Sequence, residues 1–209
     1  MSAERTRPGK ESKAPHRLRN LTTLNVQEKD DLAKTLEKSQ GTAQLWIHTH
    51  FRRASRYEIG MDRLIKNTSD NIPVIALIDS PSLNISIYRR HYAKANTKKI
   101  YYIETHPWDS TPCVYEKPRT VEEDKKNWDK FAEFLKGFGV KRIIASGMYL
   151  SDNEDPEFRG CVGFTIHALG QRGIIPFLSK ITSPYVKNSS GSKIKKLSKV
   201  ENRNLIPVS

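Results

Sequence analysis

The stretch IPVIALID (72–79) decides the fold class of this chain. Its apolar residues follow one another without polar alternation, which is typical of a strand buried on both faces of a sheet. Outward from it, four more apolar runs are predicted to be strands, and PCVYEK (112–117) a short further one. The four runs are QLWIHTHF (44–51), KKIYYIETH (98–106), VKRIIASGMYL (140–150) and IIPFLSKI (174–181).

Segments with helical periodicity alternate with these runs. The clearest is 120–139, where acidic residues fill the first turn and Trp128, Phe131 and Leu135 form an apolar stripe. Strands that alternate with helices predict an α/β fold, a three-layer sandwich with a mainly parallel, Rossmann-like sheet. The other predicted helices cover 26–39, 53–67, 82–96 and 160–173.

Positive charge is concentrated at the two ends of the chain. The 209 residues contain 36 Lys and Arg residues against 23 Asp and Glu residues, an excess of 13 positive charges. Nine of these thirteen belong to residues 1–20 and 187–209, which are poor in apolar side chains. Segments of that composition do not repay the entropy lost on ordering. We therefore predict a flexible basic tail at each end of one α/β domain over residues 21–186.

The composition also indicates the compartment. No apolar run reaches the length of about 18 residues that a membrane span needs. No apolar stretch follows the charges of the N-terminal MSAERTRPGKESKAPHR, as a secretory signal requires. Cys113 and Cys161 are the only cysteines, too few for a disulfide-stapled secreted scaffold. The sequence predicts a cytoplasmic protein with reduced thiols and no membrane partner.

The basic tails suggest a macromolecular partner. The tract NSSGSKIKKLSK (188–199) is suited to displace counterions from a polyanion, which predicts contact with nucleic acid or a ribonucleoprotein. The alternative is that the tails only keep the protein in solution.

Reactive residues gather where strands are predicted to end. Ligands of open parallel sheets bind beyond the carboxyl ends of the strands. Asp79 and Lys117 follow predicted strands, and Cys161 begins a predicted helix. A helix N-terminus and a nearby ammonium both favour the thiolate, the reactive form of cysteine, and a carboxylate can carry its proton. These three residues form a candidate nucleophilic site; the alternative is that Cys161 is a small core residue.

Three segments in this part of the chain carry a family resemblance. EKPR (116–119), VKRIIASG (140–147) and CVGFTIHALGQRG (161–173) resemble the isochorismatase-like cysteine hydrolases, which include nicotinamidases. The resemblance covers about residues 117–178 and implies hydrolysis of a small amide or vinyl-ether substrate.

The same resemblance implies roles for individual residues. Cys161 would be the nucleophile, Lys117 would stabilise its thiolate, and Asp79 would act as general base and acid. A cis peptide bond between Gly160 and Cys161 would shape an oxyanion hole. The expected substrate-binding residues are Arg52, His106 and Gly160, because they lie at or after strand ends or beside the nucleophile.

A second constellation predicts a metal site as the alternative. His48 and His50 leave one strand on the same side, and Asp79, Glu104, His106 and Asp109 follow or end neighbouring strands. Imidazole and carboxylate ligands suit zinc (Zn) or manganese (Mn), and such a metal activates water for hydrolysis. This alternative makes the protein a metal-dependent nuclease, or places a metal in the hydrolase pocket. If no metal binds, the histidines are half-buried side chains satisfied by hydrogen bonds.

Overall fold

The computed structural model describes residues 19–48, 71–78, 100–106, 111–114, 120–147, 160–179 and 205–207. The helices predicted over 53–67 and 82–96 lie outside these ranges. So do most of the two predicted tails and residues 148–159.

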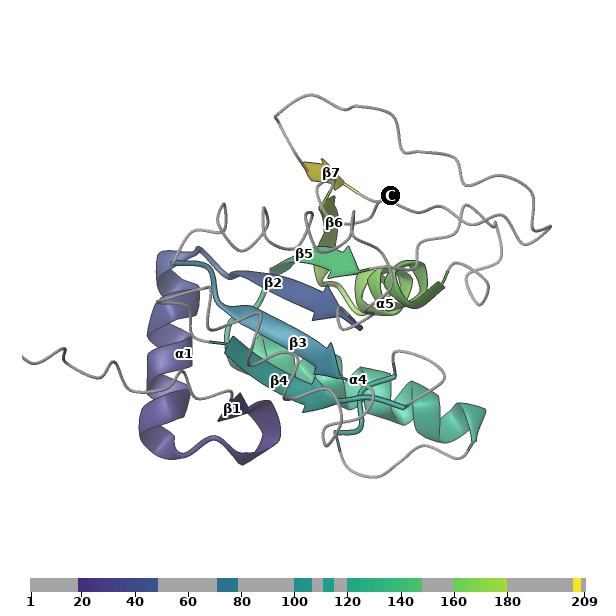
Figure 1. The fold of residues 1–209 in the computed structure, drawn as a ribbon, viewed down its shortest axis with the longest axis horizontal. Coiled ribbons are helices and arrows are strands. Elements are labelled where there is room, and N and C mark those ends of the chain that lie inside the picture. Colours follow the sequence, from purple (N-terminus) through teal and green to yellow (C-terminus); the bar gives the residue numbers. More distant parts are fainter. Residues whose placement is uncertain are drawn as a thin grey trace, which may run out of the picture.

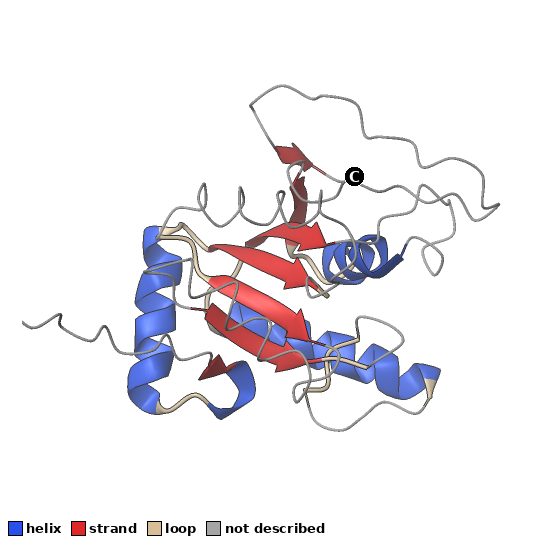
Figure 2. Ribbon diagram, viewed as in Figure 1, coloured by secondary structure: helices blue, strands red, loops and turns tan. Residues whose placement is uncertain are grey.

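The described strands form one sheet (Figures 1 and 2). Its order is β1-β4-β3-β2-β5-β6-β7, and every neighbouring pair is parallel except β6 and β7, which are antiparallel. This confirms the α/β, Rossmann-like fold with a mainly parallel sheet. The strands are Arg19–Asn20 (β1), Thr42–Ile47 (β2), Val74–Ile78 (β3), Ile100–Glu104 (β4), Arg142–Gly147 (β5), Ile175–Ser179 (β6) and Leu205–Pro207 (β7).

Helices begin where the sequence provides a cap. The Asn25 side chain accepts a hydrogen bond from the Glu28 N–H, and Thr120 accepts one from the Glu123 N–H. In both cases the glutamate side chain bonds back to the cap residue, so each helix starts with a capping box. The helices are the 3-10 helix Leu21–Thr23 (η1) and the α-helices Val26–Lys38 (α1), Val121–Gly137 (α4) and Gly160–Gly170 (α5).

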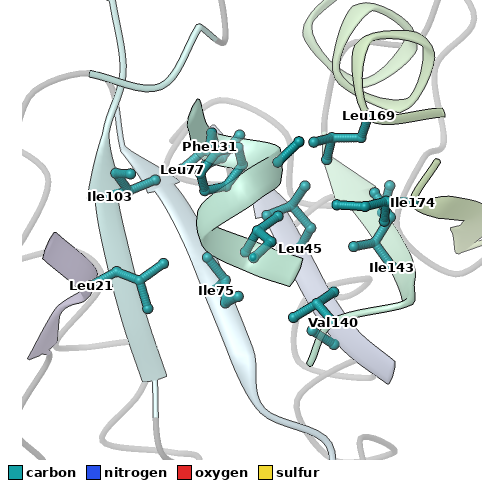
Figure 3. Packing of buried hydrophobic residues seen from close by; sticks show 14 of the residues in the cluster. Leu21, Leu45, Ile75, Leu77, Ile103, Phe131, Val140, Ile143, Leu169 and Ile174 are labelled. Carbon is teal, nitrogen blue, oxygen red and sulfur yellow. The ribbon is translucent and has the colours of Figure 1, made fainter. Parts of the chain in front are cut away.

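Residues of odd number on β2, β3, β4 and β5 face the main core. Leu45, Leu77 and Ile143 belong to one buried cluster with Phe131 of α4 and Leu169 of α5. Figure 3 shows Phe131 lying beside Leu77 within this cluster. Residues of even number on the central strands are buried on the opposite face, among them Trp46, Ala76 and Ile78. Both faces of the sheet are therefore covered, as the apolar run of β3 predicts.

The set of strands differs from the sequence-based expectation in three places. Residues 19–20 and 205–207, which fall in segments predicted as tails, add β1 and β7 to the two edges of the sheet. Within the described part of 112–117 there is only an isolated bridge between Thr105 and Pro112, not a strand. Among the described residues, no helix combines the length and apolarity needed for a membrane span.

Candidate functional site

The strand order creates a switch point between β2 and β5. From β2 the chain moves outward to β3 and β4, then returns to place β5 on the other side of β2. At a switch point, the segments that follow the two neighbouring strands pass over opposite faces of the sheet. Ligands of open α/β sheets bind in the crevice between these two segments. The carboxyl ends of β2 and β5 are therefore the first place to look for a site.

Three elements meet at Gly147, the last residue of β5. A Cβ atom on Gly147 would lie 2.7 Å from the carbonyl oxygen of Ile47 at the end of β2. The same atom would lie 2.5 Å from Cγ2 of Val162 in the first turn of α5. Only glycine leaves room for this approach, so the start of α5 lies directly against the ends of the two central strands.

Cys161 occupies the first turn of α5, as predicted. Its side chain is half-buried and packs against the main core cluster. Its carbonyl oxygen accepts a hydrogen bond of 2.7 Å from the Thr165 hydroxyl, which helps to hold the first turn. Gly160 before it has φ of 73°, a conformation that glycine adopts without strain. The described residues contain no cis peptide bond, so the expected cis bond between Gly160 and Cys161 is not present.

His48 directly follows β2 and has an unusual backbone. Its φ is 48°, in the left-handed region, and its side chain is only 3% exposed. The imidazole Nε2 lies 2.8 Å from the hydroxyl oxygen of Thr105, in a hydrogen bond that joins the ends of β2 and β4. The backbone is anchored as well, because the His48 N–H donates to the Leu77 carbonyl over 3.1 Å.

His106 lies two residues after the end of β4. Its backbone N–H donates to the carbonyl of Thr111 over 3.0 Å, and the Cys113 N–H donates to the carbonyl of Glu104 over 2.7 Å. These bonds hold residues 111–113 against the end of β4, and the His106 side chain there is half-buried. His106, which was predicted to bind substrate, therefore lies at the carboxyl ends of the strands, as His48 and Cys161 do.

The other predicted site residues lie outside the described ranges. These are Asp79, Lys117, Arg52, His50 and Asp109. Asp79 follows Ile78, the last residue of β3, in the sequence. The triad and the metal site both remain predictions. Within the described ranges, no three His, Cys, Asp or Glu side chains gather closely enough to hold a metal ion.

Two buried polar residues near the carboxyl ends of the strands were not predicted as site residues. Thr105 is 4% exposed and Ser146 is fully buried. Among the described residues, the Ser146 hydroxyl has no hydrogen-bond partner. Ser146 directly precedes Gly147 in β5. A signal for Ser146 was present, because it is a hydroxyl residue inside the apolar run RIIASG. Nothing in the sequence points to Thr105, whose partner His48 is 57 residues away.

Charge on the described part of the chain is balanced. Its residues comprise eleven basic and ten acidic side chains. Almost all of the excess of 13 positive charges therefore belongs to segments outside the described ranges.

Comparison with known proteins does not assign this chain to a family. A search with protein-family models finds none that matches this chain, and a search of curated proteins finds no match.

Proposed function

We propose that this chain is a cysteine hydrolase of the isochorismatase-like type, acting on a small amide or vinyl-ether substrate. The observation that carries the proposal is the contact at Gly147. It sets the first turn of α5, which contains Cys161, against the carboxyl ends of β2 and β5. That is the switch point where α/β sheets bind their ligands.

The first turn of a helix suits a thiolate nucleophile. Its backbone N–H groups lack partners within the helix and carry partial positive charge, which favours a negative sulfur. For an amide substrate, the Cys161 sulfur bonds to the carbonyl carbon and the carbon–nitrogen bond breaks. The amine leaves with the proton that Asp79 has taken from the thiol, and Lys117 stabilises the thiolate before attack. Water then hydrolyses the thioester and restores the thiol.

Cys113 provides an internal comparison for a test. Both cysteines are half-buried thiols, but Cys113 follows a β-bridge and Cys161 is in the first turn of a helix. The native protein is treated with iodoacetamide, and the labelling of each cysteine is followed by peptide mass spectrometry. We expect Cys161 to react at least about ten times faster at neutral pH, because the thiolate is the reactive form. Equal, slow labelling of the two thiols would remove the basis of the proposal.

A second function concerns the basic segments rather than the sheet. The described residues are balanced in charge, and nine of the thirteen excess positive charges belong to residues 1–20 and 187–209. We propose that the segment 188–199 contacts nucleic acid or a ribonucleoprotein through its lysines. This function is independent of Cys161.

A further inference from the structure

We propose that three turns at the amino end of the sheet form a surface that binds the phosphates of a nucleic acid. The inference rests on the second proposed function, contact with nucleic acid, and it adds the folded domain to the segment 188–199. Each turn joins one of the helices α1, α4 and α5 to the strand that follows it. Counted from the last turn of the helix to the first residue of the strand, these basic turns are residues 35–42, 134–142 and 167–175.

Backbone hydrogen bonds hold the three basic turns together. The Gly41 carbonyl accepts bonds of 2.8 and 3.1 Å from the N–H groups of Lys141 and Arg142. The Lys141 carbonyl in turn accepts a bond of 3.0 Å from the Ile175 N–H. These contacts follow from the sheet order, because β2, β5 and β6 are neighbours and their amino ends lie side by side. The basic turns therefore form one surface, at the ends of the strands opposite the arrowheads in Figure 1.

The charge of the described residues is unevenly distributed, although its total is balanced. The basic turns contain five basic side chains and one acidic side chain, whereas the remaining described residues contain six basic and nine acidic ones. Arg172 is paired with Asp129, because its Nε lies 2.8 Å from the Asp129 carboxylate. Four other cations of the basic turns therefore remain against Glu37 alone. They are Lys38, Lys136, Lys141 and Arg142.

The side chains of these cations extend across the turns. The Arg142 Nη2 donates to the Gln40 carbonyl over 3.1 Å. A Cβ atom on Gly173 would lie 3.6 Å from the Lys136 Nζ, so this ammonium, which belongs to α4, reaches the turn after α5. The three lysines are exposed and Arg142 is half-buried. Cations from α1, α4 and β5 are therefore accessible to a ligand at this end of the sheet.

The helix ends oppose this positive charge but do not cancel it. Each of α1, α4 and α5 ends at a basic turn, and the last carbonyl groups of a helix carry about half a negative charge. Three helix ends contribute roughly −1.5, against a net side-chain charge of +3 from the four cations and Glu37. Lys141 and Arg142 lie outside the helices, so compensation of the helix dipoles does not explain them. Ammonium and guanidinium groups are common ligands of nucleic-acid phosphates.

The basic N-terminal segment joins the sheet at the same end. Arg19 begins β1 and is paired with Tyr101, the second residue of the parallel strand β4. Residues 1–18, with five basic and two acidic side chains, therefore reach the sheet at its amino end. A long polyanion can contact this segment and the basic turns at once, which favours a nucleic acid over a small anion. The candidate site at Cys161 lies one strand length away, about 15–20 Å, so it stays open.

Two matched lysine variants test the surface, with a single-stranded RNA as the probe. The surface variant replaces the three exposed lysines of the basic turns with Gln, and the control variant replaces three exposed lysines near the starts of α1 and α4. Both variants lose three positive charges, so they differ only in where the charge is removed. Fluorescence anisotropy at several salt concentrations measures the affinity. The surface variant is Lys38→Gln, Lys136→Gln and Lys141→Gln, and the control variant is Lys29→Gln, Lys125→Gln and Lys126→Gln.

We expect the slope of log affinity against log salt to decrease in magnitude by about 2 in the surface variant, because each phosphate contact to a single strand contributes about 0.7. The affinity at low salt should fall by about 10-fold or more. The control variant should keep the wild-type slope. Urea unfolding checks that both variants are folded. If the surface variant is not, Lys141→Gln alone takes its place, with an expected change in slope of about 0.7.

The outcomes distinguish this surface from the segment 188–199. An unchanged slope in the surface variant, or an equal loss in the control variant, overturns the proposal and leaves contact through 188–199 standing. If the surface variant loses slope but neutralising the lysines of 188–199 has no effect, the surface stands and the contact through 188–199 is wrong. Wild-type binding that is absent or independent of salt overturns both. Tighter binding to poly-L-glutamate than to the RNA would indicate an acidic protein partner and would also overturn the proposal.

Discussion

Gly147 faces Val162 so closely that a methyl group on Gly147 would lie 2.5 Å from the Val162 Cγ2 atom. Contacts this short do not occur between real side chains, so one of the two residues would have to move. The same methyl group would lie 2.7 Å from the Ile47 carbonyl oxygen, so it would also be too close to β2. The absence of a side chain at Gly147 therefore sets how near α5 lies to the central strands.

Gly147→Ala should destabilise the protein. We expect the free energy of unfolding to fall by about 1–3 kcal/mol, because overpacking in a close-packed core shifts backbone and side chains. Displacement of the first turn of α5 should also change the iodoacetamide labelling rate of Cys161. Urea unfolding and peptide mass spectrometry measure the two effects.

Gly137→Ala is the matched control for that substitution. Gly137 ends α4, and a Cβ there would have no described atom within 4 Å beyond its own chain neighbours and helix backbone. Alanine is the better helix former by up to about 1 kcal/mol, so this variant should be neutral or slightly stabilised. A loss of stability in Gly137→Ala as large as that in Gly147→Ala would contradict the packing explanation.

Tyr101 should make stability depend on pH in the alkaline range. The side chain is fully buried in β4, and this burial raises the pKa of its phenol above the ordinary value of about 10, although the charge of Arg19 partly opposes the shift. The folded state therefore retains the phenolic proton at pH values where the unfolded state loses it. The resulting stability is complete below pH 10 and falls as the pH rises through the raised pKa.

Tyr101→Phe removes this dependence. The free energy of urea unfolding, measured from about pH 8 to pH 11, should decline less steeply in Tyr101→Phe than in the wild type. Tyr102→Phe changes the neighbouring, half-buried tyrosine of the same strand and serves as the control. Parallel curves for wild type and Tyr101→Phe would show that ionisation of Tyr101 is not coupled to folding.

Neutralising the C-terminal lysines should weaken nucleic-acid binding. Replacing Lys193, Lys195, Lys196 and Lys199 with Gln is preferable to deleting 187–209, because deletion would also remove β7. We expect the affinity for a single-stranded RNA to fall with rising salt in the wild type, with a smaller slope in the variant. Fluorescence anisotropy at several salt concentrations measures both. Binding that is absent, or independent of salt, would exclude contact through this tail.

Local sequence patterns predicted the helices and strands that are stabilised by residues within the same segment. The helix predicted over 120–139 is α4, Val121–Gly137, because its apolar stripe and its Thr120–Glu123 capping box all lie within the same segment. The run 72–79 contains β3, Val74–Ile78, because consecutive apolar residues suit only a strand with two covered faces. The short strands β1 and β7 were not predicted, since each is defined by pairing with a strand far away in the sequence.

The features of the candidate site also fall into two groups, those that local sequence predicts and those that it does not. The sequence by itself determined an α/β fold and the placement of Cys161 at the start of a helix, because helical and strand periodicity are properties of neighbouring residues. Only the tertiary structure decided that β2 and β5 are adjacent, that Gly147 admits Val162, and that His48 bonds to Thr105. These relationships join segments from different parts of the chain. They are selected by packing and hydrogen bonding of the whole sheet, which no local pattern encodes.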